Sequence, residues 1–318
     1  MTPAAPSIIS LCPNPALDKS THIDHVVPDE KLRCGPPRVD PGGGGVNVAR
    51  AIHQIDGDCL LLYPAGGPTG DLIEMLLKEE GVEQHRLSVK ATTRESFTVF
   101  EDATGHQYRF STPGGEVTEE EWQDYLEAIF DSTTLPRYIV GSGSISPGMP
   151  DDFYAQIARR CRENDIRFII DSSGEEFRQA VDAGVFLVKP NMRELGHLAG
   201  EEIRNEAHQI AVSQGLVDAG KAQVVIVSLG AGGALLVTED RQEHIRAPTV
   251  HIQSKIGAGD TMVGGITLAL SRDRSVREAA YYGIAAGSAA VTTPGTELAH
   301  EDDVERLFER MWSRVESN

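Results

Sequence analysis

Residues Ile256-Gly-Ala-Gly-Asp-Thr261 join a predicted strand, Glu243–Gln253, to a predicted helix, Met262–Leu270. Glycine permits backbone angles closed to other residues and keeps side chains out of the space before the helix. The unpaired amides at the start of the helix, with its dipole, favour an anion there. Asp260 adds a carboxylate beside that anion site, as phosphoryl transfer to a hydroxyl requires. An ordinary helix cap is the alternative.

A second glycine-rich junction lies upstream, at Pro41-Gly-Gly-Gly-Gly-Val-Asn-Val-Ala-Arg50. It runs directly into a predicted helix, Val46–Ile55, and Asn47 in the first turn is placed to bond a hydroxyl. Backbone without side chains lets a ligand approach closely. A flexible loop is the alternative, but the direct join to a helix favours binding.

The loop Cys12-Pro-Asn-Pro-Ala-Leu-Asp18 follows a short apolar strand, Ser7–Leu11. Its two prolines end the strand and force an irregular loop at the carboxyl end. Open parallel sheets bind ligands at that edge. Asp18 is therefore placed either to bond a sugar hydroxyl or to cap a turn, and the residues alone leave both open.

Predicted strands and helices alternate along the remainder of the chain, which indicates a mostly parallel sheet with helices on both faces. The predicted strands are 59–63, 138–142, 168–171, 185–189 and 224–228, and the predicted helices are 71–80, 119–130, 152–163, 175–183, 205–219, 276–291 and 300–315. Residues 222–238 are uncharged but interrupted by glycines, so they predict a buried hairpin rather than a membrane span.

Two polar segments do not fit the core pattern. Ser20–Val39 alternates only loosely, and Ser96–Glu101 and Gln107–Ser111 form a predicted hairpin. Together they predict a second, small sheet that covers the site. We therefore expect one α/β domain over residues 1–318, with lid segments at about 19–40 and 91–112.

The chain has 318 residues and a formal net charge of −19. That charge argues against nucleic acid or an anionic membrane as a partner, so local cations and amides must hold any anionic ligand. Four scattered cysteines without CxxC spacing predict neither a zinc site nor disulfides. The N-terminal MTPAAPSIIS lacks the basic start of a signal peptide, so we expect a cytoplasmic protein.

Five motifs occur in one order along the chain: GGGG-VN, SGS-ISPG, KPN-x-x-E, VSLG and IGAGD. Together they resemble the ribokinase/PfkB family of carbohydrate kinases over nearly the whole chain. The segments NPALD (14–18), EKLRC (30–34), HQYRF (106–110) and IDSSGE (170–175) are most similar to the 6-phosphofructokinase branch of that family.

The resemblance implies a three-layer α/β/α fold with a β-sheet lid, and ATP-dependent phosphorylation of fructose 6-phosphate at its 1-hydroxyl. Asp260 would be the base for the acceptor hydroxyl. Taken alone, Lys31 and Arg94 would more often be surface charges, but the resemblance favours a binding role. The remaining implied contacts are Gly257, Ala258 and Gly259 as the anion hole, Asp18, Gly43 and Asn47 for the sugar, and Lys31, Arg94 and Ser144 for its phosphate.

The cofactor residues also follow from the resemblance. Glu194 would hold Mg²⁺ through water, although a Glu near a helix dipole is the alternative. The nucleotide would contact Lys189, Asn191, Ser228 and Gly230, and a K⁺ loop would be built from Ser254, Ile256, Ala290 and Gly295. Thr293 and Glu297 stand where the family leads us to expect an Asn and an Arg beside that loop.

The family also implies a homodimer formed through the lid sheets. Kinases of fructose 1-phosphate or tagatose 6-phosphate are the nearest alternatives. A nucleoside kinase is a weaker alternative, because its acceptor is uncharged and would not need the cations of the lid. From a different class, a catalytically silent sugar-phosphate-binding regulator is a further alternative, but Asp260, Asn191 and Glu194 count against it.

Overall fold

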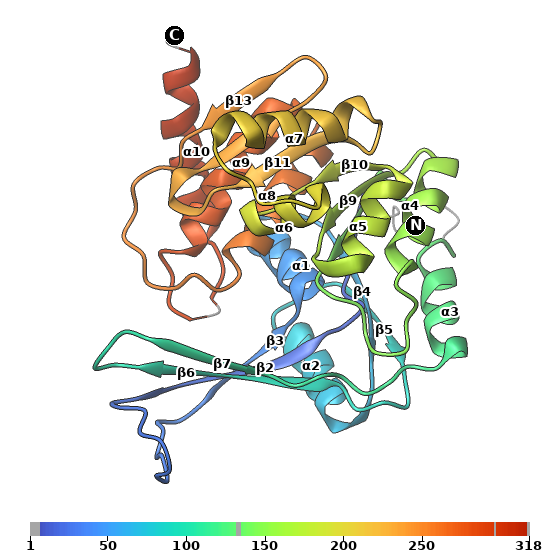
Figure 1. Ribbon diagram of the computed structural model, residues 1–318. Helices are drawn as coiled ribbons and strands as arrows, with labels where there is room; N and C mark the ends of the chain where they lie inside the picture. The colour runs from blue at the N-terminus through green and yellow to red at the C-terminus, as the bar shows by residue number, and fades with distance from the viewer. Residues whose placement is uncertain (1–6, 132–134, 296, 317–318) are drawn as a thin grey trace.

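The computed structural model describes residues 7–131, 135–295 and 297–316. Residues 1–6 lie outside the described residues, so the structure does not bear on the prediction that this N-terminus is not a signal peptide. The described residues form a nine-stranded sheet with helices on both faces and a separate four-stranded sheet (Figure 1). This confirms the predicted three-layer α/β/α fold with a small β-sheet lid.

The large sheet has the strand order β13-β12-β11-β10-β9-β8-β1-β4-β5, and only the pairs β11–β12 and β12–β13 are antiparallel. Short apolar runs suit strands that are covered on both faces. Since the parallel strands share one direction, their carboxyl ends meet at one edge. The strands are β1 (Ile8–Leu11), β4 (Leu60–Ala65), β5 (Gln84–Ser88), β8 (Tyr138–Ser142), β9 (Arg167–Asp171), β10 (Val185–Val188), β11 (Ala222–Ser228), β12 (Ala234–Val237) and β13 (Gln242–Ile245).

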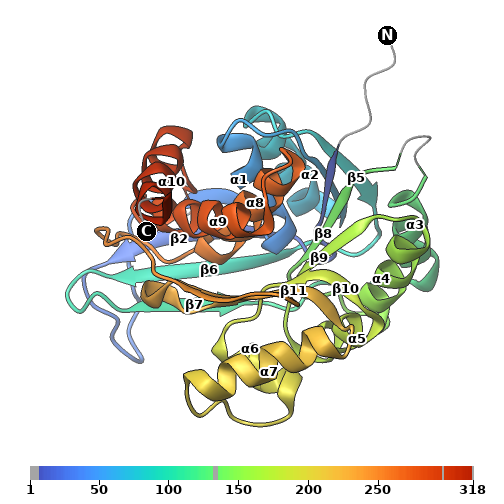
Figure 2. The same ribbon diagram turned by 90° about the horizontal axis from the view of Figure 1, so that it is seen from above.

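Two sets of helices cover the sheet, one on each face, and Figure 2 shows them on opposite sides. One face carries α1 (Gly44–Gln54), α2 (Gly67–Glu79), α8 (Ala258–Ser271), α9 (Val276–Ala290) and α10 (Glu301–Glu316). The other carries α3 (Glu119–Ala128), α4 (Phe153–Glu163), α5 (Gly174–Ala183), α6 (Met192–Ala199) and α7 (Glu206–Asp218). Each face therefore has its own apolar core.

The small sheet has the strand order β3-β2-β6-β7. Its strands are β2 (Ala16–Ile23), β3 (Arg38–Gly42), β6 (Arg94–Glu101) and β7 (Gln107–Ser111). Side chains alternate between its faces, so Asp18 and Ser96, which are directly opposite, share one face, while Phe97 and Phe110 share the other. The sheet lies beside the body like a lid (Figure 1).

The strand predicted over residues 243–253 is shorter than expected. Its partner β12 has four residues, and β13 pairs with all of them from Gln242 to Ile245. Every residue of β12 is then paired, and the chain leaves the sheet as a loop. The predicted buried hairpin over residues 222–238 is confirmed as β11 and β12, which are antiparallel. Within the described ranges, no helix is long and apolar enough to cross a membrane.

Candidate active site

The glycine turn before α8 leaves its amides unpaired. Gly257 is the N-cap with φ 74°, and the first hydrogen bond of the helix runs from the Thr261 amide to the Gly257 carbonyl at 2.8 Å. Among the described residues, the amides of Gly257, Ala258 and Gly259 have no acceptor. A side chain at 257 would also meet Leu298, 2.6 Å from the added carbon. The turn therefore presents unpaired amides at the place where the sequence predicts an anion site.

Asp260 lies at this helix start and is held by two neighbouring elements. The Asn47 side-chain amide of α1 donates to one carboxylate oxygen at 2.9 Å, and the Ser142 hydroxyl at the end of β8 lies 3.5 Å from the other. Burial, followed by the nearby Asp171 carboxylate, raises the pKa of Asp260 to about 7, while Asn47, Lys189 and Ser142 oppose the rise. A carboxylate with a pKa near neutral pH is suited to accept a proton.

A buried ion pair lies beside the anion site. The Lys189 Nζ atom is 3.1 Å from the Asp171 carboxylate, and it lies 3.8 Å from where a side chain at Gly259 would begin. Burial lowers the pKa of Lys189, but the carboxylates of Asp171, Glu194 and Asp260 outweigh it, and the net pKa is raised. The lysine is therefore a permanent cation at the place where phosphate oxygens would gather.

The pKa of Asp260 predicts how activity depends on pH. Only the ionised carboxylate accepts a proton, so kcat/KM is expected to rise about tenfold per pH unit below pH 7 and to level off above it. The Asn47 hydrogen bond lowers this pKa, so Asn47→Ala is expected to move the rise to higher pH. If the rise came from the phosphate of the substrate instead, the variant would leave its midpoint in place.

The tetraglycine run seats α1 against the carboxyl end of the sheet. A side chain at Gly44 would lie 2.7 Å from the Gly143 amide, and one at Gly43 would lie 2.7 Å from the Cys12 sulfur. Gly43 also has φ 106°. The side chain of Asp18 fills the space that a side chain at Gly42 would take. Glycine is thus required by close approach as well as by backbone angle, and the run brings Asp18 next to α1.

The predicted phosphate ligands Arg94 and Ser144 meet around Asn14. Arg94 donates to the Asn14 carbonyl at 3.1 Å and to the Ser111 hydroxyl at 2.8 Å. The Asn14 side-chain amide donates to the Ser144 hydroxyl at 3.3 Å. Burial raises the pKa of Asp18, and the nearby guanidinium of Arg94 opposes that rise. These residues are therefore neighbours where the lid joins the body.

Lys31, the third predicted phosphate ligand, lies away from Arg94 and Ser144 in the same chain. The 24–37 loop is tied to the far end of the lid, where the Gly35 amide bonds the His22 carbonyl and the Val26 amide bonds Glu101. That end of β2 is about 17 Å along the strand from Asp18. Figure 1 shows the loop hanging from the outer end of the lid. Lys31 itself is exposed there.

The predicted nucleotide residues lie together beyond β10 and β11. Asn191 caps α6: its side-chain oxygen accepts from the Glu194 backbone amide at 2.9 Å, and its own backbone amide donates to the Glu194 carboxylate at 2.8 Å. Asn191 forms a bridge with Ser228. Gly230 has φ 57° and open space where a side chain would be. The helix-start role of Glu194 is thus present, and its carboxylate keeps further lone pairs for the waters of Mg²⁺.

The predicted K⁺ loop brings two segments together. The Ser254 hydroxyl bonds the Gly295 carbonyl at 2.7 Å, and the Gln253 amide bonds the Val291 carbonyl at 2.8 Å. The Thr293 hydroxyl lies 2.8 Å from the Ala290 carbonyl, and the carbonyls of Glu297 and Leu298 face the same hydroxyl. The Thr293 hydroxyl has one proton to donate, so it can satisfy only one of these three carbonyl oxygens at a time. Such an excess of oxygens suits a monovalent cation.

Sequence reasoning missed three polar residues of this site: Asn14, Ser142 and Asp171. Ser142 and Asp171 are the last residues of β8 and β9, and Asn14 follows β1. Their signal was available, because a polar side chain at the carboxyl end of a predicted parallel strand lies at the ligand edge. Asp260, the partner of Ser142, is 118 residues away in the chain, whereas Lys189, the partner of Asp171, directly follows the next strand of the chain.

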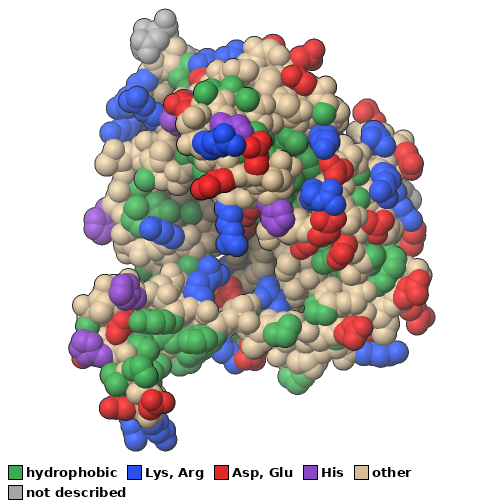
Figure 3. All heavy atoms as spheres, in the orientation of Figure 1, with side chains coloured by type: hydrophobic (Ala, Val, Ile, Leu, Met, Phe, Trp, Pro, Cys, Tyr) green, Lys and Arg blue, Asp and Glu red, His purple; other side chains and the backbone are tan. Residues whose placement is uncertain are grey.

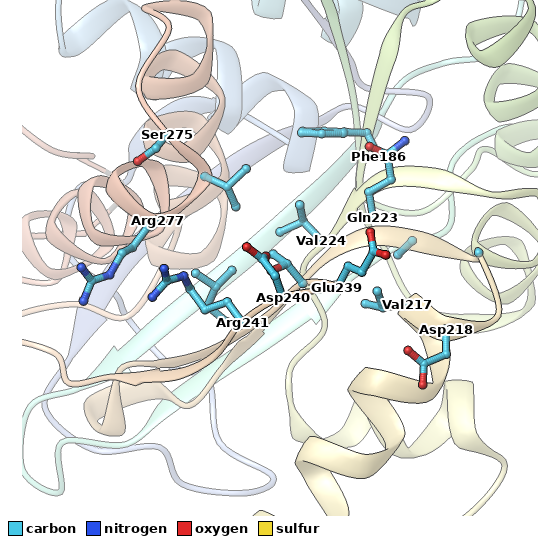
Figure 4. Close-up of a pocket in the computed structure, with 15 residues that line it drawn as sticks. Phe186, Val217, Asp218, Gln223, Val224, Glu239, Asp240, Arg241, Ser275 and Arg277 are labelled. Carbon is cyan, nitrogen blue, oxygen red and sulfur yellow. The ribbon is translucent and has the colours of Figure 1, made fainter.

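A hollow of about 940 Å³ lies elsewhere, at the amino ends of β10 and β11. Figure 4 shows Asp218, Gln223 and Glu239 around it, with Arg277 beside it. Arg277 is bound by Glu243 at 2.7 and 2.8 Å. The hollow is on the opposite edge of the sheet from Asp260, so we assign it no part in the chemistry.

Lys and Arg side chains line both sides of the hollow between lid and body in Figure 3. In a chain of net charge −19, such a concentration favours anionic ligands there. An open α/β sheet with a β lid, unpaired amides at a helix start and an adjacent carboxylate is the arrangement expected of a small-molecule kinase.

Comparisons with known proteins give the family. Residues 13–303 match the pfkB family of carbohydrate kinases, and the chain belongs to that family. It is 45% identical to ATP-dependent 6-phosphofructokinase isozyme 2 of Mycobacterium tuberculosis, over 96% of this chain and 89% of the relative. It is 39% identical to the isozyme 2 of Escherichia coli, over 95% and 97%.

Solved structures agree with this assignment. The phosphofructokinase-2 of Escherichia coli in complex with potassium matches with a TM-score of 0.92 and 37% identity, over 96% of this chain and 99% of that one. The same enzyme has been solved in a tetrameric inhibited form, with a TM-score of 0.91 and 37% identity over the same shares.

Proposed function

We propose that this protein transfers the γ-phosphoryl group of ATP to the 1-hydroxyl of fructose 6-phosphate, as an ATP-dependent 6-phosphofructokinase. The observation that carries the proposal is the carboxylate of Asp260 beside the unpaired amides of Gly257–Gly259. The choice of a phosphorylated sugar is supported by Arg94, which lies where the lid joins the body, and by the 45% identity to the mycobacterial relative.

In this proposal Asp260 accepts the proton of the sugar hydroxyl as its oxygen attacks phosphorus in line, without a covalent enzyme intermediate. Asn47 and Ser142 keep the carboxylate in place. The amides of Gly257, Ala258 and Gly259 and the ammonium of Lys189 stabilise charge on the transferring oxygens. The lid excludes water that would otherwise accept the phosphoryl group.

The residues at the nucleotide side fit MgATP. Asn191 and Ser228 are bridged, Gly230 has open space where a side chain would be, and Glu194 is half-buried with lone pairs to spare. Glu194 would hold Mg²⁺ through water, and the ion supplies charge neutralisation on the phosphates when bound. We also propose K⁺ at the carbonyl-rich loop of Ser254, Ile256, Ala290 and Gly295, which adjoins the anion site.

An ADP-release assay on purified protein tests the function. Fructose 6-phosphate, fructose 1-phosphate, tagatose 6-phosphate and ribose are each supplied with MgATP, and we expect the highest kcat/KM with fructose 6-phosphate. A higher value with another phosphosugar would make that sugar the substrate. ADP release that no sugar accelerates would favour the silent regulator instead.

We further propose a cytoplasmic homodimer formed through the lids. Four exposed apolar side chains belong to the lid and its loop: Val27, Leu32, Phe97 and Phe110. Phe97 and Phe110 are directly opposite each other in β6 and β7, on the face turned away from Asp18. A partner lid would cover this surface. Such a dimer would also bring Lys31 of one chain near the sugar-binding site of the other.

Phe110→Asp is expected to convert the dimer to a monomer. Phe110 is 59% exposed, and a carboxylate in the centre of an apolar interface would be buried without a partner. Sedimentation velocity measures the change, with Leu135→Asp, remote from the lid, as the control. A wild-type protein that sediments as a monomer would contradict the proposal.

A further inference from the structure

Arg50, in the middle of α1, is a charged side chain that is only 2% exposed. Its guanidinium is held by the Glu80 carboxylate at the end of α2, with Nε and Nη2 donating at 2.6 and 2.7 Å. Its third nitrogen, Nη1, donates to the Pro41 carbonyl of β3 at 3.2 Å. One buried side chain therefore joins α1, the end of α2 and a strand of the lid.

Stability alone does not explain an arginine at this buried position. A buried ion pair is often no more stabilising than apolar residues of the same volume. The planar guanidinium, in contrast, bonds a carboxylate and a carbonyl on two other elements in one fixed geometry, which the single nitrogen of a lysine cannot reproduce. The arrangement therefore favours a role in fixing the positions of these elements.

Pro41 directly precedes the tetraglycine run, which leads into α1. The N-cap of α1 is Gly43, which has no side chain to cap the helix. Glycine loses more conformational freedom on ordering than other residues, so this junction needs a fixed point on either side. Ser10 provides one, since its hydroxyl donates to the Gly45 carbonyl at 2.7 Å. Arg50 provides the other at the Pro41 carbonyl, so the run is held at both ends.

Two predicted site residues depend on this junction. Asp18 is directly opposite Asp40 in the pairing of β2 with β3, and the Asp40 carboxylate lies 4.0 Å from the Arg50 guanidinium. On α1, Asn47 lies one turn before Arg50 and donates to Asp260 at 2.9 Å. Arg50 thus connects the strand that pairs with β2 to the helix that holds the proposed base.

We infer that Arg50 is a positioning residue for phosphoryl transfer, which fixes the tetraglycine junction so that Asp18 and Asn47 take up their working positions together. The inference rests on the proposed function, because it needs Asp18 at the sugar and Asn47 at the base. The alternative is that Arg50 only stabilises the fold through its ion pair with Glu80. A role in the fold alone would leave KM and the pH dependence of the folded enzyme unchanged.

Steady-state kinetics of Arg50→Lys test the inference, because lysine keeps the charge but loses the two-sided contact. We expect kcat/KM for fructose 6-phosphate to fall about 10- to 100-fold, the effect of a displacement of about 1 Å at a reaction centre. KM is expected to rise through Asp18 and kcat to fall through Asn47. Arg277→Lys, in the remote bidentate pair with Glu243 at 2.7 and 2.8 Å, is the matched control.

The pH profile gives a readout that a role in the fold alone would not move. The Asn47 hydrogen bond lowers the pKa of Asp260, so Arg50→Lys is expected to shift the rise of kcat/KM to higher pH. Added to Asn47→Ala, the same substitution is expected to cause no further shift, because it acts through the lost bond. The other groups that act on this carboxylate belong to other elements: Ser142, Asp171 and Lys189.

A second variant, Glu80→Gln, tests the same inference if Arg50→Lys does not fold. Glu80 is 31% exposed, so its neutralisation removes less buried charge than a change at Arg50. The amide keeps one acceptor for the guanidinium. KM and the pH midpoint are therefore expected to move in the same directions as in Arg50→Lys, by a smaller factor. Thermal melting checks that each variant is folded.

The outcomes separate the inference from the proposed function. If folded Arg50→Lys and Glu80→Gln keep the wild-type KM and pH midpoint, Arg50 serves the fold alone and the inference is wrong. Equal changes in Arg277→Lys, or a full further shift in the Asn47→Ala background, would also contradict it. If the wild type prefers another phosphosugar, the proposed substrate is wrong, and the same variants measured with that sugar decide the inference. A wild type whose ADP release no sugar accelerates would overturn both.

Discussion

Asp260→Asn is expected to lower kcat by roughly 10²–10⁴-fold, because the variant loses the group that we propose accepts the proton of the sugar hydroxyl. The amide has nearly the shape of the carboxylate, and the anion site is built from backbone amides that the substitution leaves in place. Binding of ATP is therefore expected to change little. Single-turnover kinetics and calorimetric titration with MgATP measure the two quantities.

The same substitution has a second expected effect, on stability. The pKa of Asp260 is raised from 3.8 to about 7 by folding, so the folded state holds a proton that the unfolded state releases between those pH values. This stabilisation is complete below about pH 4 and is lost as the pH rises through 7. Asn cannot ionise, so at pH 8 the variant is expected to be more stable than the wild type by on the order of 4 kcal/mol.

Chemical denaturation of both proteins at pH 5 and pH 8 measures that difference. Ser142→Ala is a matched control, since it removes a neighbour of the same carboxylate and keeps the titrating group. An Asp260→Asn enzyme with near-normal turnover would show that another group accepts the proton. An equal stability difference at both pH values would show that the pKa of Asp260 is not raised by folding.

Local sequence signals were sufficient for the parts of the site that are built from backbone. Glycines before a helix predicted the turn at Gly257 and the tetraglycine run, because the cause of each conformation lies within a few residues. The alternation of residues 96–101 and 107–111 likewise predicted the β6–β7 hairpin. These features depend on short-range sterics and on the period of the strand.

The pairings between side chains could not be predicted in the same way. Asn47 meets Asp260 across 213 residues, and Lys189 meets Asp171 because β9 and β10 are neighbours in the sheet. Such contacts follow from strand order, which no single stretch of sequence contains. For Lys31 the resemblance predicted a phosphate ligand, but the structure places it away from Arg94 in the same chain, because the 24–37 loop is held at the outer end of the lid.

Lys189→Met is expected to destabilise the fold by about 3–5 kcal/mol at neutral pH, because it leaves a buried carboxylate without its cation. The side chains of Lys189 and Asp171 are 5% and 14% exposed, and they are 3.1 Å apart. Burial raises the pKa of Asp171, and the Lys189 ammonium opposes that rise. Without the lysine, Asp171 gains a proton more readily, so the loss of stability is expected to shrink as the pH falls.

Activity should fall with the same substitution for a separate reason. Lys189 is the cation beside the anion site, and it also lowers the pKa of Asp260. In the proposed mechanism the variant loses a charge that stabilises the phosphoryl oxygens, and the pH rise of any remaining activity should move to higher pH.

The double variant Lys189→Met/Asp171→Asn separates the two effects. Removing the carboxylate as well takes away the unpaired buried charge, so most of the lost stability is expected to return while turnover does not. Urea denaturation and the ADP-release assay are run on the wild type, both single variants and the double variant. If Lys189→Met is as stable as the wild type, then Lys189 and Asp171 do not form a buried ion pair. Recovery of turnover in the double variant would mean that Lys189 serves the fold alone and does not act on the phosphates.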